Sequence, residues 1–219
     1  MLEYRMLRNG GEPVWVESSA RPPEPGGMIA IVTRDVTERH EWQELLMIAA
    51  MHDPVTGLAN RNLFDESLDS ELARIARHGV LLAVLFIDLD NFKALNDRLG
   101  HLAGDKVLQH AADRISRHVR AGDVAARYGG DEFVVACVDL NSPAEAQMTA
   151  ERMRDELARP YRIDDQFETV SASVGVAVWQ PGMTPDQLVH AADQAMYSVK
   201  RRTITLPDAR RPTDADQGI

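Results

Sequence analysis

An uninterrupted apolar run from Val80 to Ile87, which ends at Asp88, constrains the fold of this 219-residue chain more than any other feature. A run with no polar face predicts a strand that is buried on both sides of its sheet. A sheet covered on both faces needs helices, and helical patterns precede and follow this run. The run is also far shorter than the roughly 20 apolar residues that span a bilayer. We therefore expect a layered α/β domain and no membrane span.

Helical and strand patterns alternate around this central strand. The helices are predicted to begin near Asn60, Phe92, Gly104, Ser142 and Thr184, and the strands to cover Val124–Tyr128, Phe133–Val138 and Thr169–Trp179. Ser142 and Thr184 are each followed three residues later by Glu or Gln, the spacing of a capping box. The pair Gly129-Gly130 indicates a hairpin between two of the strands. The alternation predicts the α/β (α+β) class, with an antiparallel hairpin in the sheet.

The first 51 residues have a different pattern. Short β-rich runs lie at Val14–Val16 and Ile29–Val32, and two such strands are too few for a stable domain. A helix is predicted from Asp35, which has capping-box spacing with Glu38. Its apolar residues recur every three or four positions, which favours equally a coiled-coil seam and a single amphipathic helix packed on its neighbours. The sequence Asp53-Pro54 predicts its end, because a residue before proline avoids the helical conformation.

Charge and cysteine content exclude several classes of protein. The chain has 24 Lys and Arg against 34 Asp and Glu, a net charge of −10, so it lacks the basic surface that wraps duplex nucleic acid. Its one cysteine, Cys137, makes no intrachain disulfide and argues for a reducing compartment. Neither a second cysteine nor paired histidines are available for a Cys/His zinc site. No signal-peptide pattern is present, so we expect a cytoplasmic protein.

Acidic residues follow two of the predicted strands. Asp88 ends the buried strand and Asp90 lies two positions further, while Asp131 and Glu132 follow the turn at Gly129-Gly130. If the hairpin lies beside the buried strand, these carboxylates converge at one edge of the sheet. Clustered carboxylates repel one another unless a cation lies between them, and hard oxygen ligands suit Mg²⁺. The alternative interpretation of the spacing is a set of ordinary solvated carboxylates at strand ends.

Four ordered blocks resemble the GGDEF family, the diguanylate cyclases, over residues 52–202. They read DPVTGLANR (53–61), DLDNFKALND (88–97), GHLAGD (100–105) and YGGDEF (128–133). The resemblance implies a palm-like domain with a central, mostly antiparallel sheet flanked by helices. It also implies that two GTP molecules condense into cyclic di-GMP and release two pyrophosphates. The 3′-hydroxyl of each GTP would attack the α-phosphate of the other across an antiparallel homodimer.

The resemblance assigns roles to individual residues of this sequence. It implies that Asp131 and Glu132 are catalytic, and that Mg²⁺, or Mn²⁺ as the alternative ion, binds Asp88 and Asp131 by side chain and Leu89 by its carbonyl. Asn96 would bind guanine together with Asp105, whose selectivity for guanine disfavours another dinucleotide product. The other implied substrate contacts are Phe92, Lys93, Gly129, Gly130 and Lys200.

Two further features concern regulation. Arg120 and Asp123 match the family's R-x-x-D inhibitory site, with Arg74 as a contributor, which implies that cyclic di-GMP is inhibitor as well as product. Ile204 replaces an arginine that the family usually places after the last helix, which leaves one phosphate contact without its residue. The alternative function is therefore a catalytically weak receptor that binds GTP or cyclic di-GMP through Arg120 and Asp123.

The segments before and after this domain complete the predicted organisation. GGEPVWVES (10–18) and TRDVTER (33–39) resemble the closing strands and exit of a PAS domain, so residues 1–34 are predicted as a partial PAS segment without a complete sensory pocket. Residues 35–51 are predicted as a signalling helix that couples two chains. Residues 203–219 are polar and rich in Pro and Asp, and we expect a disordered tail there.

Overall fold

The computed structural model describes residues 1–21, 27, 29–78 and 80–205, and it divides into two compact units, residues 1–50 and residues 51 onward. Most of the predicted tail, residues 206–219, lies outside the described residues. The first three tail residues belong instead to the last helix, which ends at Thr205. No helix in the described part of the chain is long and apolar enough to cross a membrane.

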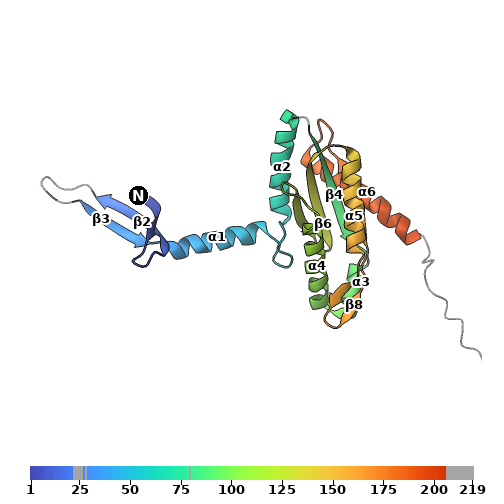
Figure 1. Ribbon diagram of the computed structural model, residues 1–219, viewed down its shortest axis with the longest axis horizontal. Coiled ribbons are helices and arrows are strands. Elements are labelled where there is room, and N and C mark those ends of the chain that lie inside the picture. Colours follow the sequence, from blue (N-terminus) through green and yellow to red (C-terminus); the bar gives the residue numbers. More distant parts are fainter. Residues whose placement is uncertain (22–26, 28, 79, 206–219) are drawn as a thin grey trace, which may run out of the picture. The chain divides into compact units, whose positions relative to one another are not determined.

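The N-terminal unit is an antiparallel sheet of three strands in the order β1-β2-β3, followed by a helix (Figure 1). The elements are β1 (Leu2–Leu7), β2 (Pro13–Arg21), β3 (Ala30–Asp35) and α1 (Thr37–Met51). Strand β1 was not predicted, because it pairs through backbone atoms and buries none of its side chains. Helix α1 begins two residues later than predicted, because Asp35 still pairs in β3 and its carboxylate accepts a hydrogen bond from the Thr37 N–H at 2.9 Å.

No residue of α1 is buried, and Trp42 and Leu45 are 60% and 56% exposed. The first turn of α1 does contact the sheet, because the His40 ring stacks on that of Trp15 with 4.2 Å between the ring centres. The interpretation of α1 as a helix packed on its neighbours therefore stays a prediction. The coiled-coil seam stays a prediction.

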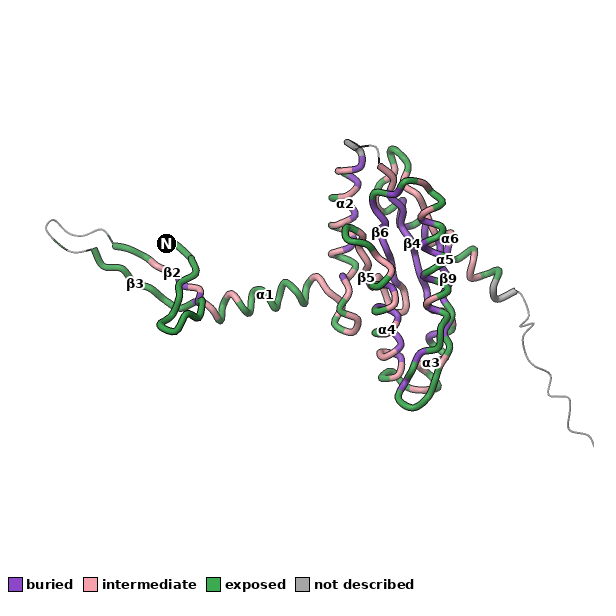
Figure 2. Tube along the Cα trace, viewed as in Figure 1, coloured by how far each residue is buried: buried purple, intermediate pink, exposed green. Residues whose placement is uncertain are grey.

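The second unit is built on a four-stranded antiparallel sheet in the order β5-β6-β4-β9 (Figure 2). Its elements are α2 (Arg61–His78), β4 (Leu81–Leu89), α3 (Phe92–Leu99), α4 (His101–Ser116), β5 (Val124–Gly129), β6 (Glu132–Leu140), α5 (Pro143–Leu157), β7 (Tyr161–Ile163), β8 (Gln166–Glu168), β9 (Ala172–Val178) and α6 (Pro185–Thr205). This confirms the α/β class and the mostly antiparallel sheet flanked by helices. The predicted apolar run is the inner strand β4, which pairs with β6 on one side and β9 on the other.

Strand β4 is buried on both faces, as predicted, and Figure 2 shows it inside the domain. Alternate residues from Ala83 to Leu89 pack in one core with α3, α4 and α5. The residues between them, from Leu82 to Phe86, pack in a second core with α2 and α6. The domain therefore has three layers, with the sheet between two sets of helices. The end of β4, where Asp88 lies, is therefore at an edge of the sheet between the two layers of helices.

The helix boundaries show which capping predictions hold. Asn60 accepts a hydrogen bond from the Leu63 N–H at 3.1 Å, as expected of a residue that caps α2. The side chains of Thr184 and Gln187 exchange hydrogen bonds with each other's backbone N–H, the predicted capping box of α6. The box predicted at Ser142 is wrong, because its side chain makes no capping hydrogen bond.

Two further local features differ from the sequence predictions. Helix α4 begins at His101, so the glycine-containing block 100–105 forms its first turn rather than a connection before it. The short strands β7 and β8 form a separate hairpin, which three-residue strands with no periodic pattern did not reveal. This hairpin lies between α5 and β9 in the chain.

Candidate active site

The acidic residues predicted to share one sheet edge do lie together. In the register of β4 and β6, Asp88 is directly opposite Glu132, so both side chains point to the same face of the sheet. The Leu89 N–H donates a hydrogen bond to the Asp131 carbonyl at 3.2 Å, which ties the hairpin turn to the end of β4. The structure thus brings together the four residues predicted to be catalytic or metal-binding.

Lys200 reaches this cluster from the other end of the sequence. Its ammonium lies 2.5 Å from a carboxylate oxygen of Asp88, whose residue is only 8% exposed. Burial raises the pKa of Asp88, and Lys200 partly offsets this effect. Partial burial lowers the pKa of Lys200, but its hydrogen bond to Asp88 raises it, and the net shift is upward. The lysine therefore stays charged and occupies the position that a cation would take beside Asp88.

Glu132 lies in a less compensated environment than Asp88. Burial, followed by the negative charges of Asp88 and Asp131, raises the pKa of Glu132. Its carboxylate lies over the turn, because a Cβ atom built on Gly129 would be 2.8 Å from a Glu132 oxygen. A cleft of about 600 Å³ opens beside it, and its lining includes Tyr128, Gly129, Glu132 and Asp193. A carboxylate with a raised pKa at the mouth of a cleft suits proton abstraction from a bound hydroxyl.

Arg127 holds the glycine turn in place. Its guanidinium donates to the Gly130 carbonyl at 3.0 and 2.7 Å, and to both oxygens of Asp53 at 3.1 Å. Burial raises the pKa of Asp53, but hydrogen bonds from Thr56 and Arg127 outweigh this effect and lower it overall. A Cβ atom at Gly130 would meet nothing within 4 Å, so the protein itself leaves this position open. An open backbone at a held turn suits the close approach of a ligand.

The side chain of Asp90 forms hydrogen bonds with two serines. Its two carboxylate oxygens accept hydrogen bonds from the Ser171 and Ser173 hydroxyls at 2.7 and 2.8 Å. Two residues apart on one strand would point the same way, but β4 ends at Leu89, so strand alternation does not orient Asp90 with Asp88. Asp90 instead attaches the end of β4 to the segment that enters β9.

The predicted guanine-binding residues lie on the helix pair α3 and α4. Asn91, with φ of 57°, turns the chain from β4 into α3, where Phe92 is buried and Lys93 is exposed. The side-chain oxygen of Asn96 is buried and has no hydrogen-bond partner. It lies against Gly104, where a Cβ atom would be 1.9 Å from it. A buried acceptor without a partner points to a ligand that donates a hydrogen bond.

Asp105 is half-buried in the first turns of α4, next to Gly104. Asn96 and Asp105 are therefore presented at the same corner between two helices. Along the chain, the turn between β4 and α3 separates this corner from the Asp88 cluster.

The residues predicted to form an inhibitory site lie at the opposite end of β6. Asp123 accepts a hydrogen bond from the Val138 N–H at 3.0 Å, and Arg74 pairs with Asp139 at 2.8 Å. Val138 is six residues from Glu132, which corresponds to roughly 20 Å along a strand. Asp123 and Arg74 thus contact consecutive residues of β6. The contribution of Arg74 to an inhibitory site, from this or a second surface, stays a prediction.

Arg120 forms an ion pair with Glu145, which was not predicted as a site residue. Its guanidinium pairs with Glu145 at 2.8 Å, and its backbone N–H donates to Asp123 at 2.9 Å. The second oxygen of Glu145 accepts a hydrogen bond from the Asn141 N–H at 3.0 Å, so this glutamate lies in place at the start of α5. Sequence reasoning also gave no role to Arg127 or to Ser171, because their contacts join segments far apart in the chain. Ile204 belongs to α6, but its side chain lies outside the described residues.

The chain matches the family described as "Diguanylate cyclase, GGDEF domain" over residues 50–204. It is 45% identical over 156 residues to the diguanylate cyclase TpbB of Pseudomonas aeruginosa, which covers 70% of this chain and 36% of TpbB. It is 38% identical over 199 residues to an uncharacterized signaling protein of Caulobacter vibrioides, covering 87% of this chain and 25% of that protein. The chain thus spans about a quarter to a third of the length of these relatives.

A solved structure gives the same result for the fold. The coiled coil and GGDEF domain of DgcB from Caulobacter crescentus, in complex with cyclic di-GMP, has a TM-score of 0.71 and 32% identity, covering 76% of this chain and 89% of that one. The matched residues include the acidic sheet edge, the glycine turn and the α3–α4 corner described above. The chain belongs to the GGDEF family of diguanylate cyclases.

Proposed function

We propose that this chain condenses two GTP molecules into cyclic di-GMP and releases two pyrophosphates. The observation that carries this proposal is the cross-strand pair of Asp88 and Glu132, with Lys200 bonded to Asp88 and Asp131 beside it. Together these groups supply acids that can hold a metal ion, an ammonium group that can bind phosphates, and a carboxylate that can accept a proton. The family of the chain supports the same function.

The donor set at the sheet edge fits Mg²⁺. Among the described residues, no three His, Cys, Asp or Glu side chains form a ready cage for a metal ion. Mg²⁺ does not require one, because it keeps waters and is usually held by one or two carboxylates together with substrate phosphates. Asp88 and Asp131 would hold it by side chain and Leu89 by its carbonyl, with Mn²⁺ as the alternative ion. When bound, such an ion offsets the charge on the phosphates and polarises them.

The chain's own residues carry out the remaining steps. Glu132 accepts the proton of the 3′-hydroxyl, and the 3′-oxygen then forms a bond to the α-phosphorus of the other GTP. The bond from that phosphorus to pyrophosphate breaks, and pyrophosphate leaves. Lys200 moves from Asp88 to the phosphates, together with Lys93 and the backbone at Phe92. The exposed Gly130 and its neighbour Gly129 leave room for the phosphates at the turn.

Guanine recognition is assigned to Asn96 and Asp105. The unpartnered oxygen of Asn96 accepts a hydrogen bond from the base, and the Asp105 carboxylate accepts from the N–H groups at the guanine edge. Adenine does not present the same pattern of N–H groups. Because one domain holds one GTP and the product joins two nucleotides, the reaction takes place between two copies of the chain. The exposed apolar residues of α1 suit the pairing of two helices, and the structure of DgcB also contains a coiled coil.

A product assay tests this function. The protein is incubated with GTP and Mg²⁺, with and without ATP, and the products are identified by mass. We expect cyclic di-GMP only, a specific activity that falls on dilution below the dimer Kd, and loss of product in Asp131→Asn. Asp113→Asn, an exposed acid on α4, is the matched control and keeps its activity. Binding of GTP or cyclic di-GMP without any dinucleotide product at high protein concentration would reject the enzyme in favour of the receptor function.

The assembly around Arg120, Asp123 and Arg74 supports feedback inhibition by cyclic di-GMP. Both arginines lie at one end of β6, and guanidinium groups bind phosphate and guanine edges well. The residues that hold them, Glu145 and Asp139, compete with an anionic ligand for these arginines. We expect Glu145→Gln to lower the half-inhibitory concentration of cyclic di-GMP and Arg120→Ala to abolish inhibition. An unchanged inhibition curve in Arg120→Ala would show that the inhibitory site lies elsewhere.

The N-terminal unit is proposed to transmit a signal to this domain. Its sheet and following helix are compatible with residues 1–34 as the closing part of a PAS domain and residues 35–51 as a coupling helix. Residues 52–202 are proposed as the catalytic domain.

A further inference from the structure

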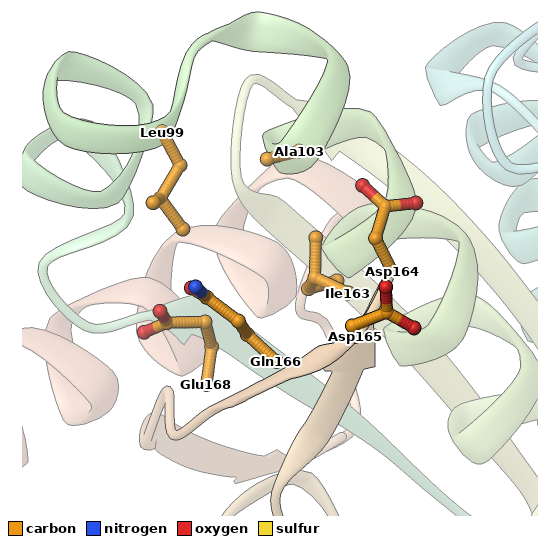
Figure 3. Close-up of a pocket in the computed structure, with 7 residues that line it drawn as sticks. All are labelled: Leu99, Ala103, Ile163, Asp164, Asp165, Gln166 and Glu168. Carbon is orange, nitrogen blue, oxygen red and sulfur yellow. The ribbon is translucent and has the colours of Figure 1, made fainter.

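The β7–β8 hairpin, residues 161–168, lies against the corner between α3 and α4 that carries the proposed guanine contacts. At this corner a single residue, Gly100, with φ of 84°, connects α3 to α4. A hollow of about 320 Å³ separates the corner from the hairpin, with Leu99 and Ala103 on the corner side (Figure 3). Ile163, Glu168 and the turn between them line the other side (Figure 3). Leu99 and Ala103 pack against the core that includes Ile163, but the hollow leaves this apolar packing incomplete.

Two ion pairs span the hollow. Arg98 on α3 donates to both oxygens of Glu168 on β8, at 3.0 and 2.6 Å, and Lys106 on α4 pairs with Asp164 in the hairpin turn. The two pairs differ in strength. The Glu168 side chain is 15% exposed, whereas that of Asp164 is 75% exposed and its pair is screened by salt. The bonds from Arg98 lower the pKa of Glu168, so this glutamate is charged at neutral pH.

The other end of the hairpin is attached to the acidic edge of the sheet. Three residues after Glu168, the Ser171 hydroxyl donates to Asp90 at 2.7 Å, and the Asp90 N–H donates to the Ser171 carbonyl at 2.8 Å. Asp90 lies two residues beyond Asp88. A short path of charged and hydrogen-bonded contacts therefore runs from helix α3 through Glu168 to the end of β4.

The base of the hairpin is anchored more firmly than its turn. Arg114 on α4 donates to the carbonyls of Arg159 and Pro160 at 2.6 Å, and its guanidinium lies 3.9 Å from the centre of the Tyr161 ring. Tyr161 is fully buried in the core. The base of the hairpin is thus anchored to α4, and the Arg98–Glu168 pair is its charged contact with α3, the helix that carries Asn96.

We propose that Arg98 and Glu168 are positioning residues that hold the guanine-binding corner at a set distance from the acidic edge of the sheet. This inference rests on the proposed function, because it requires a nucleotide whose base lies at the corner and whose phosphates lie at the edge. Asn96 is two residues before Arg98 on the same helix. Loss of the pair lets the corner move, and the base contacts then no longer coincide with correct placement of the α-phosphate.

Nucleotide binding and turnover test the proposal together. Binding of a non-hydrolysable GTP analogue and of the matching inosine analogue, which lacks the 2-amino group, is measured by calorimetry with Mg²⁺. In Glu168→Gln we expect the GTP analogue to bind about fivefold more weakly, the size expected when a half-buried, two-pronged pair loses its charge. The inosine analogue should lose less, because it makes fewer contacts with the corner. KM should rise more than kcat falls, and Arg98→Glu/Glu168→Arg should recover most of the affinity.

Glu156→Gln is the matched control. Glu156 pairs with Arg159 at 2.9 Å, its side chain is 20% exposed, and the pair lies outside the α3–α4 corner. This variant should bind both analogues as the wild type does. The proposal is overturned if Glu168→Gln binds the GTP analogue as the wild type does, or if both analogues weaken equally. A wild-type protein that binds neither analogue would refute the proposed function itself, and the positioning role would fall with it.

Discussion

Gly175 controls how closely α6 approaches the sheet, and its replacement by alanine gives a direct test of the site's construction. A Cβ atom at Gly175 in β9 would lie 2.0 Å from the Met196 nitrogen, 2.3 Å from the Ala192 carbonyl oxygen and 2.6 Å from the Met196 Cα. All three are backbone atoms, so no side chain can rotate away. Ordinary contact begins at 3.4 Å, so the helix must move by about 3.4 − 2.0 = 1.4 Å.

This displacement affects both stability and the site. Forced overpacking of a core costs about 1–3 kcal/mol, and backbone contacts place Gly175→Ala at the upper end. For a chain of this size about 3 kcal/mol corresponds to a fall in Tm of about 10 °C. Lys200 lies one helical turn beyond Met196, so the same movement withdraws its ammonium from Asp88. A misplacement of about 1 Å in such a site can reduce turnover about 100-fold.

Calorimetric melting and the rate of cyclic di-GMP formation measure the two effects. Gly130→Ala is the control for stability, because a Cβ atom there meets nothing within 4 Å, and its Tm should equal that of the wild type. If Gly175→Ala melts with the wild type, the close contact between β9 and α6 does not exist. If it melts lower but keeps full turnover, turnover does not depend on how closely Lys200 approaches Asp88.

Three further predictions follow from the polar groups near the sheet. Arg127→Lys loses the two-pronged contact with Asp53, and the free energy of unfolding in urea should fall by about 2 kcal/mol; an unchanged value would show that this pair contributes nothing. Because burial and then Asp88 raise the pKa of Glu132, the folded state binds its proton more tightly than the unfolded chain, so ionised Glu132 reduces stability. Glu132→Gln should therefore raise the Tm of the metal-free protein near pH 8, with the difference vanishing near pH 4; a lower Tm at both pH values would contradict this. Burial raises the pKa of Cys137 to about 12, so iodoacetamide should label it in urea but not in the folded protein near pH 8; rapid labelling of the folded protein would refute its burial.

The fold could be predicted wherever the pattern of burial repeats along the sequence. Phe64, Leu68 and Ile75 follow the helical period and are buried in α2, and the apolar run at residues 80–87 is the strand inside the sheet. Strand β1 and the β7–β8 hairpin could not be predicted in this way. The strands β7 and β8 have only three residues each, too few for a period, and β1 buries none of its side chains, so its residues mark no core face.

The candidate site divides in the same way. Its acids and glycines stand in contiguous blocks, so Asp88, Asp131 and Glu132 could be selected from the sequence as candidate catalytic and metal-binding residues. The selection named the residues but not their partners. Glu145 could not be assigned to Arg120, because the two are 25 positions apart and many other acids lie as close along the chain.

The sequence by itself determined the longer helices and the sheet strands of the second unit, the family resemblance and the chemical types at the site. Helical and strand periods and local motifs are properties of neighbouring residues. The tertiary structure alone decided which charges meet. Lys200 lies 112 positions from Asp88, yet the close packing of α6 on Gly175 brings them into contact. Arg98 and Glu168 are 70 positions apart and meet only because the hairpin folds against the corner. Such pairs depend on the path of the chain in three dimensions, and Coulomb energy acts over that distance, not over sequence separation.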